Sequence, residues 1–373
     1  MSTKPAASAT DPSLRAQTWG TVRFRDARLA AQADAEGVVT AWLTLLQHGG
    51  PAAALQTYGS FAVALDLAPG ETFLAVDRFA VQSLCWRVID GQLHFAERAD
   101  TLAAMPPQAE LDPQAIFDYL YFHVIPAPRT VFRGVFRLPA GHYAMFEQGH
   151  MTVAPYWIPH FEEPSNADFG ALAEEFRSLL RDAVRDQLDG GKAACFLSGG
   201  TDSSTVAGMI SVVTGKGADA YSIGFEADGY DEMAYAQLAA KHFGARHHAY
   251  YVTPDDLVRT IPLVAGHYDQ PFGNSSVLPA YHCARVARED GVTRLLAGDG
   301  GDELFGGNER YATQRVFGIY GQVPGPLRSG LLEPLLLGTP LGGLPLLRKG
   351  RSYIQQAQVP LPDRLQTYNL LGR

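Results

Sequence analysis

The sequence predicts an α/β protein with two domains: an N-terminal α+β domain with antiparallel sheets, then a domain with a doubly wound parallel sheet. The chain has 373 residues, enough for two domains, and 46% of them are hydrophobic. Residues 18 to about 160 contain mostly strand-like segments separated by turn signals. From about residue 190 onward, short apolar segments alternate with helical patterns, which is typical of a parallel sheet covered on both faces.

In the N-terminal domain, strands are expected in the segments GSFAVALDL, TFLAVDR, CWRVIDGQLHFAE and GHYAMFEQGHMTVAPYW. The sequences DGQ and EQGH inside them are typical of hairpin turns. One helix is expected in LDPQAIFDYLYF, where Asp112 can cap the N-terminus and Pro113 fits the first turn. Residues 1–17 lack the apolar core of a signal peptide and are expected to form a disordered tail.

The polar segment PHFEEPSNADFG marks the expected boundary, so the two predicted domains are 18–160 and 166–373. A long amphipathic helix should follow it, because apolar residues recur at helical spacing from Phe169 to Leu188. The strands expected after it are 193–197, 220–225, RHHAYYVT and VTRLLAG. The helices expected between these strands are 203–213, GYDEMAYAQLAAKHFG, DDLVRTIPLVAGHY and VLPAYHCARVARED.

Charge and cysteine content narrow the function classes. The formal net charge is -9 and no basic block occurs, which argues against a nucleic-acid or anionic-membrane partner. No uninterrupted apolar run reaches the ~18 residues of a membrane span, so a cytoplasmic location is expected. Cys85, Cys195 and Cys283 form no CxxC pair, which argues against structural zinc and a disulfide framework. Cys195 is expected in the core because it lies inside an apolar strand.

The first loop with potential chemistry is SGGTDSS, residues 198–204. Gly199 and Gly200 let backbone N–H groups approach an anion, and the N-terminus of the next helix points to the same place. Asp202 would repel a phosphate unless Mg²⁺ lies between them. The loop has no lysine, so it is not a Walker A sequence. The alternative is a helix cap after a glycine turn.

The second loop, LLAGDGGDELFGGNERY, spans residues 295–311 and also follows an apolar strand. It contains five glycines together with Asp299, Asp302 and Glu303. Glycines allow close backbone packing against a ligand, and the acids could provide a further metal contact. The alternative is a glycine-rich surface turn.

Taken together, the two loops resemble those of the N-type ATP pyrophosphatases. The segments SIGFEADGYDEMAYAQLAAKHFG and LLAGDGGDELFGGNERY narrow this resemblance to the asparagine synthetase family, and QPFGNSSVLPAYHCARVAR lies between them in the right order. The N-terminal block resembles the later part of that family's amidotransferase domain, so the resemblance covers roughly residues 55–373. It implies an Ntn-like antiparallel sandwich domain followed by an adenine nucleotide α-hydrolase-like synthetase domain.

The resemblance also implies an activity, that of an ATP-dependent, AMP-forming amide ligase. Such an enzyme adenylates a carboxylate, by default that of aspartate, and an amine or ammonia then displaces AMP. The implied cofactors are ATP and Mg²⁺. The residues implied to bind ATP are Ser198, Gly199, Gly200, Asp202, Ser203, Ser204, Ile223, Ala297 and Gly298. The implied metal ligands are Asp202 and Asp302, and the implied catalytic residue is Asp299. Asp231 is interpreted as a helix cap.

Two features depart from the family pattern. Residue 2 is Ser2, no cysteine precedes Cys85, and the early Arg-Gly-Pro-Asp stretch is missing. We therefore expect a degenerate amidotransferase-like domain that hydrolyses no glutamine. Family members also continue well past the position of Arg373, in a part that carries a catalytic lysine. None of the five lysines of this chain lies in either loop, so a C-terminally truncated synthetase domain is expected.

The motifs leave the substrate open. The implied partners are a small carboxylate, either aspartate or a peptide or amino-acid derivative, and an amine or ammonia. One alternative is a synthetase that closes β-lactam or lasso-peptide rings, and another is a non-catalytic ATP-binding protein. A protein partner or a homodimer is compatible with the sequence. Arg129 and Arg133, in FHVIPAPRTVFRGV, are expected to anchor a linker across the domain interface rather than contact a ligand.

Overall fold

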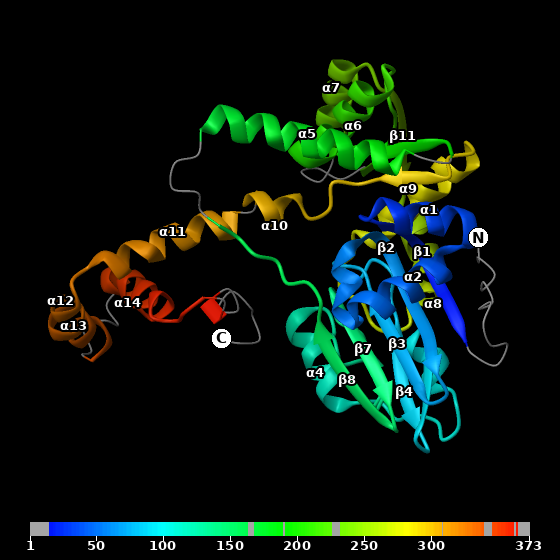
Figure 1. Cartoon of the computed structure of the whole chain (residues 1–373). Helices are drawn as coiled ribbons and strands as arrows, with labels where there is room; N and C mark the ends of the chain where they lie inside the picture. Colours follow the sequence, from blue (N-terminus) through cyan, green and yellow to red (C-terminus); the bar gives the residue numbers. More distant parts are fainter. Residues whose placement is uncertain are drawn as a thin grey trace. The chain divides into compact units, whose positions relative to one another are not determined.

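The computed structural model describes residues 15–162, 168–188, 191–225, 232–307, 309–338, 345–361 and 363–364 (Figure 1). The chain divides into two compact units. The first comprises Met1–Ser165 together with Ala265–Asn274, and the second comprises Asn166–Val264 together with Ser275–Arg373. Of the predicted disordered tail, residues 1–14 lie outside the described residues, and the first strand already begins at Ala16. Within the described ranges, no helix is both long and apolar enough to cross a membrane.

The first unit contains two antiparallel sheets, which confirms the predicted class of the N-terminal domain (Figure 1). The larger sheet has the order β1-β2-β3-β7-β8, formed by β1 (Ala16–Phe24), β2 (Thr57–Ala68), β3 (Glu71–Val76), β7 (His142–Glu147) and β8 (His150–Pro155). The smaller sheet has the order β5-β4-β6, formed by β4 (Cys85–Ile89), β5 (Gln92–Ala96) and β6 (Phe136–Arg137). Both predicted hairpin turns are present, at Asp90-Gly91 and Gln148-Gly149, where all four residues have positive φ.

The helices of the first unit only partly match the prediction. The expected helix is α4 (Pro113–Phe122), and Asp112 caps it by accepting a hydrogen bond from the backbone N–H of Gln114 at 3.0 Å. The prediction of a single helix was wrong, because α1 (Ala27–Glu36), α2 (Val38–Gly49), the 3-10 helix η1 (Pro51–Gln56) and α3 (Ala99–Ala103) are also present. Helix α2 packs on the larger sheet, and the ring of its Trp42 lies 5.6 Å from that of Phe61.

A buried carboxylate organises the connection between β3 and β4. Asp77 is 1% exposed and accepts hydrogen bonds from four backbone N–H groups. The donors are Phe61 at 3.2 Å, Phe79 at 3.0 Å, Val81 at 3.1 Å and Gln82 at 3.0 Å. Hydrogen bonds to an ionised carboxylate are stronger than neutral ones, so this single side chain fixes the path of residues 77–82.

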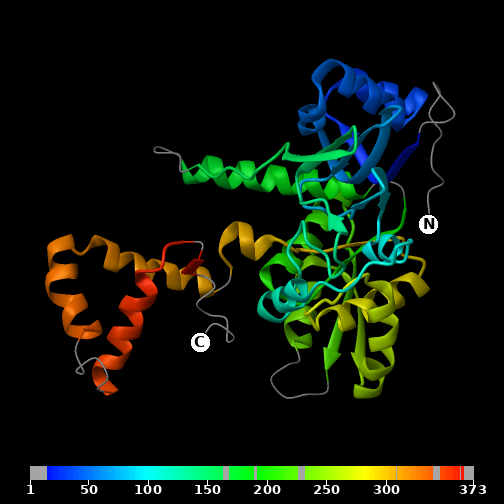
Figure 2. The ribbon, with the colours of Figure 1, turned by 90° about the horizontal axis from the view of Figure 1, so that it is seen from below.

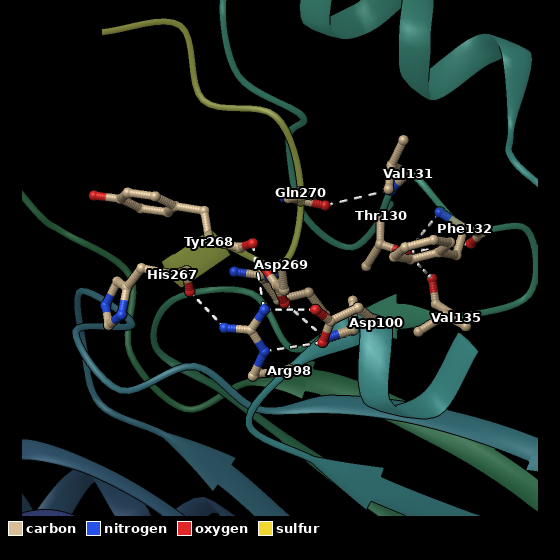
Figure 3. A network of polar contacts seen from close by, with 12 residues as sticks. Arg98, Asp100, Thr130, Val131, Phe132, Val135, His267, Tyr268, Asp269 and Gln270 are labelled. Carbon is tan, nitrogen blue, oxygen red and sulfur yellow. Dashed lines mark hydrogen bonds and ion pairs between the residues drawn. The ribbon is translucent and has the colours of Figure 1, made fainter. Parts of the chain in front are cut away.

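Residues 265–274, distant in sequence, complete the first unit (Figure 3). Asp269 accepts hydrogen bonds from Arg137 Nη2, at 2.8 and 2.6 Å, and from the backbone N–H of Ala99 at 2.6 Å. Arg98 donates to the carbonyls of His267 and Tyr268. The side chains of Asp269 and Arg137 are only 10% and 23% exposed, so this ion pair is shielded from water.

Arg129 and Arg133, predicted to anchor a linker across the domain interface, pair instead with residues of the first unit. Arg129 pairs with Asp112 at 2.8 Å and with Asp118 at 3.3 Å. Arg133 pairs with Glu110 at 3.3 Å. Both arginines therefore tie their proline-containing segment to α4 and to the residues just before it. These partly exposed pairs contribute little stability by themselves.

The second unit contains a parallel sheet of order β11-β10-β9-β12, as predicted. Its strands are β9 (Ala193–Phe196), β10 (Asp219–Phe225), β11 (Arg246–Val252) and β12 (Arg294–Leu296). The chain moves outward from β9 to β10 and β11, and then returns to the other side of β9 at β12. The strand order thus reverses between β9 and β12, the kind of position where ligands bind in open α/β sheets.

Helices cover both faces of this sheet, so the doubly wound prediction is confirmed. One face packs against α5 (Phe169–Gln187), α6 (Thr201–Thr214) and α7 (Met233–Phe243). The other face packs against α9 (Val277–Glu289) through Cys283 and Ala287. Cys195 lies in the core, as expected. Helix α8 (Pro254–His267) precedes α9, while Asp231, the predicted cap, lies outside the described residues.

Every regular element after β12 in the described residues is a helix or a helical turn. The elements are α10 (Gly301–Phe305), α11 (Glu309–Gln322), α12 (Gly325–Leu327), the π-helical turn η2 (Arg328–Leu332), α13 (Glu333–Leu337) and α14 (Pro345–Ala357). Figure 2 shows α11–α14 in orange and red as one group. The ring of Phe317 stacks 5.4 Å from that of Tyr353, and the Tyr320 hydroxyl donates to Glu333. These contacts join α11 to α14 and α13.

Candidate active site

The two loops singled out from the sequence lie at the same edge of the parallel sheet. Residues 198–204 follow β9, and residues 297–303 follow β12. These two strands are hydrogen-bonded neighbours, with Cys195 opposite Leu296. Because parallel strands present their carboxyl ends on one side, both loops lie where the strand order reverses.

The backbone of the first loop requires a glycine at one position. Gly199 has a φ of +86°, and a Cβ there would lie 2.4 Å from the carbonyl carbon of Tyr235 in α7. Helix α6 begins two residues later. Ser203 Oγ accepts a hydrogen bond from the backbone N–H of Ser198 at 3.1 Å, and the two serine hydroxyls lie 3.0 Å apart. The hydroxyls therefore shape the loop, and the same two serines line a hollow. No side chain caps the N-terminus of α6, contrary to the capping alternative.

The second loop packs directly on Asp202. A Cβ at Gly298 would lie 2.7 Å from the Asp202 Cβ, and a Cβ at Gly301 would lie 2.4 Å from its Oδ2. Glycine is needed at both positions because a larger residue would displace the carboxylate. The glycines thus bring the two loops into contact, which a simple surface turn would not require.

A polar hollow of about 560 Å³ lies between these loops. Seven of the predicted site residues line it: Ser198, Asp202, Ser203, Ala297, Gly298, Asp299 and Asp302. Its remaining lining residues are Phe196, Ser276, Ala280, Gly300 and Glu303. The hollow thus presents carboxylate oxygens, hydroxyls and glycine backbone.

An apolar hollow of about 330 Å³ adjoins it. Its lining residues are Phe196, Leu197, Ser198, Tyr221, Ser222, Ile223, Phe225, Glu232, Met233, Ala236, Ser276, Pro279, Ala280 and Cys283. It shares Phe196, Ser198, Ser276 and Ala280 with the polar hollow. The predicted Ile223 is part of its wall, and its mostly apolar surface suits a flat aromatic ring.

Three of the predicted site residues do not line either hollow. Gly199, Gly200 and Ser204 line neither hollow. The Ser204 hydroxyl is buried, with no hydrogen-bond partner among the described residues. The sequence motifs point to no candidate in the segment before α9, yet Ser276 lines both hollows. A serine just before a helix was the available signal, although many helices begin that way.

The charges of the site are unbalanced. Asp202, Asp299, Asp302 and Glu303 line the polar hollow, and among the described residues no lysine or arginine lines either hollow. Among the described residues, no three acidic, histidine or cysteine side chains are placed to hold a metal ion by themselves. A cation here would therefore need oxygen atoms from a bound ligand as well. This is how proteins commonly hold Mg²⁺, with one or two carboxylates and substrate phosphates.

Comparison with known proteins identifies the family. The asparagine synthase family model matches residues 175–367, which is more than half of the chain and contains both loops. The chain belongs to the asparagine synthase family. A second model, for a glutamine amidotransferase domain, matches residues 19–157, which lie in the first unit.

Individual curated proteins are moderately similar to the chain. The chain is 27% identical over 292 residues to asparagine synthetase (glutamine-hydrolyzing) 1 of Bacillus subtilis, covering 78% of this chain and 45% of that protein. It is 28% identical over 345 residues to a protein of Mycobacterium bovis provisionally named asparagine synthetase (glutamine-hydrolyzing). This match covers 90% of this chain and 51% of that protein. It is 26% identical over 291 residues to amidase chyE of Penicillium rubens, and this match covers 72% of this chain and 43% of that protein. The chain spans about half the length of these relatives.

The three cysteines of the chain are expected to be unreactive. All three are buried and free. Burial raises the pKa of the Cys85 thiol to about 11, and those of Cys195 and Cys283 to about 12, so little thiolate exists near neutral pH. We expect no thiol to react with an aromatic disulfide reagent at pH 7, and all three to react in denaturant. Rapid modification of one thiol in the folded protein would contradict this.

Proposed function

We propose that the chain is an ATP-dependent, AMP-forming amide ligase of the asparagine synthetase type. The observation that carries the proposal is the adjoining pair of hollows at the point where the strand order reverses. The apolar hollow suits an adenine ring, and the acidic, hydroxyl-lined hollow suits a chain of phosphates with Mg²⁺. The family assignment supports the same reaction class.

The donor set fits ATP and Mg²⁺. Asp202 and Asp302 would hold the ion together with phosphate oxygens, because carboxylates alone would repel the phosphates. The bound ion would supply neutralisation of the charge that develops on the leaving pyrophosphate. Hydroxyls of Ser198 and Ser203 would donate to phosphate oxygens, while Ile223 would pack on the base.

The remaining predicted residues would act through the backbone or at the acceptor. Gly199 and Gly200 give the first loop a path that lets its backbone approach an anion closely, and Ser204 lies in the first turn of α6 behind it. Ala297 and Gly298 would contact the nucleoside. Asp299 would accept a hydrogen bond from the incoming amine and hold it near the activated carboxylate, where the new bond forms.

We further propose that residues 1–373 do not hydrolyse glutamine themselves. The buried thiols support this, since none of the three cysteines has the exposure or the low pKa of a nucleophile. Ammonia or an amine would then be the direct nitrogen donor. Aspartate is the default carboxylate. The described residues that line the two hollows include carboxylates but no lysine or arginine, which favours a second candidate, a protein that binds ATP-Mg²⁺ without turnover.

Two measurements on the whole chain distinguish these functions. Calorimetric titration with ATP in the presence and absence of Mg²⁺ tests binding, and pyrophosphate release with ATP, aspartate and ammonium tests turnover. We expect Mg²⁺-dependent binding and AMP formed in equal amount to pyrophosphate. Binding without pyrophosphate release would support the second candidate, and absence of ATP binding would contradict both.

A further inference from the structure

A series of hydrogen bonds lies behind the first loop and begins on β11, which is not a neighbour of β9 in the sheet. His247, in β11, places its Nε2 atom 2.7 Å from the Oγ of Ser222 in β10. The Ser222 hydroxyl in turn donates to the backbone carbonyl of Leu197, the residue before the loop. Ser222 is only 4% exposed, so water does not substitute readily for either partner.

The direction of these bonds follows from the donors present. A carbonyl only accepts, so the single proton of the Ser222 hydroxyl points to Leu197. His247 must therefore donate from Nε2 to the Ser222 oxygen. Burial, with a smaller contribution from the charge of His248, lowers the pKa of His247 below its usual value of 6.5. The ring is therefore neutral at pH 7 and carries its one proton on Nε2.

The accepting carbonyl belongs to the peptide group that leads into the loop. The carbonyl of Leu197 and the N–H of Ser198 form one planar unit. Its oxygen is held by Ser222, while its N–H donates to Ser203 Oγ at 3.1 Å. The N–H of Leu197 itself donates to the carbonyl of Tyr221 at 2.9 Å. The orientation of this peptide decides where the following N–H groups of the loop point.

We propose that His247 is a positioning residue that fixes the loop 198–204 through Ser222. His247 itself lines neither hollow, and the effect on ATP binding that we expect from it rests on the proposed function. Without the His247 donor, the Ser222 hydroxyl can rotate away from Leu197, which frees one side of the Leu197–Ser198 peptide. Loss of a residue that orients a binding group through a hydrogen bond commonly lowers affinity or activity by roughly 10-fold.

The experiment compares four variants of the whole chain. His247→Phe keeps a ring but removes the donor, whereas His247→Gln can donate from its amide Nε2. Ser222→Ala removes the intermediate hydroxyl, alone and together with His247→Phe. His242→Phe, at an exposed position of α7, is the matched control. Hydrogen exchange of the peptide covering residues 198–204 is measured without nucleotide, followed by the affinity for ATP-Mg²⁺.

We expect His247→Phe to speed exchange in the loop about fivefold, and His247→Gln and His242→Phe to match the wild type. Ser222→Ala should equal His247→Phe, and the double variant should show no additional effect. Two results would overturn the proposal. One is a wild-type exchange rate for residues 198–204 in His247→Phe. The other is a double variant in which His247→Phe speeds exchange by its full factor on top of the effect of Ser222→Ala. If His247→Phe does not fold, Ser222→Ala replaces it with the same expectation. A wild type that binds no ATP contradicts the proposed function, while the exchange result still decides the inference.

Discussion

Replacing Asp202 by asparagine is expected to lower kcat/KM for pyrophosphate release on the order of 100-fold or more, since metal-assisted charge neutralisation is worth several kcal/mol. Asp202 is the carboxylate on which both loops meet, because Gly298 and Gly301 pack against it. An amide has nearly the same shape and keeps that packing. The lost negative charge would weaken Mg²⁺ binding, so the variant should need a higher Mg²⁺ concentration for half-maximal rate.

The measurement is a Mg²⁺ titration of pyrophosphate release, with thermal unfolding to confirm that the variant is folded. Asp255→Asn is the control, because this exposed aspartate lies in the first turn of α8 and lines neither hollow. We expect its titration curve to match that of the wild type. An Asp202→Asn enzyme with an unchanged rate and Mg²⁺ requirement would remove Asp202 from the proposed metal site.

The second large effect is expected from Gly199→Ala, which should destabilise the second unit by roughly 2–4 kcal/mol. Two costs add at this position. The φ of +86° disfavours any residue with a Cβ, and the new Cβ would lie 2.5 Å from the backbone nitrogen of Ala236 as well as close to Tyr235. These are backbone atoms of α7, so they cannot move aside as a flexible side chain would. Relief requires a shift of the loop or the helix, and ATP affinity should fall with it.

Gly200→Ala provides the matched comparison one residue later. Gly200 has a φ of -69°, and its Cβ would meet only Ser198 Oγ, at 3.3 Å. We expect the free energy of unfolding of this variant to lie within about 0.5–1 kcal/mol of the wild-type value. Denaturant unfolding of both variants, followed by a signal from the second unit, makes the comparison. Equal stability of the two variants would show that residue 199 does not adopt this backbone conformation.

Local rules explain what the sequence predicted well. Asp112 and Pro113 specify the start of α4, and Asp90-Gly91 specifies a hairpin, because each depends on a few neighbouring residues. The regular apolar spacing after Phe169 predicted α5 almost to its ends. Most of the polar hollow was also predicted, since its residues lie in two short loops that each follow an apolar strand.

The helices and site residues that the sequence did not predict also have a physical explanation. The sequence of helix α1 carries no strong apolar stripe and therefore does not predict a helix, and none of its residues is fully buried. Helix α2 has such a stripe around Trp42, yet its apolar, β-branched start resembles a strand. Ser276 joins the site only because the chain crosses back before β12. The bond between His247 and Ser222 depends on the register of two parallel strands, which a single sequence does not reveal.

The contact between Arg137 and Asp269 has a consequence for synthesis on the ribosome. The strands of the first unit are translated well before Asp269, whose carboxylate pairs with the mostly buried guanidinium of Arg137. Until Asp269 has been translated, the guanidinium lacks both this ion pair and the segment that shields it from water. The nascent first unit therefore stays incomplete until translation has passed Asn274. A gene cut at the boundary after Ser165 would encode a fragment that never receives this partner.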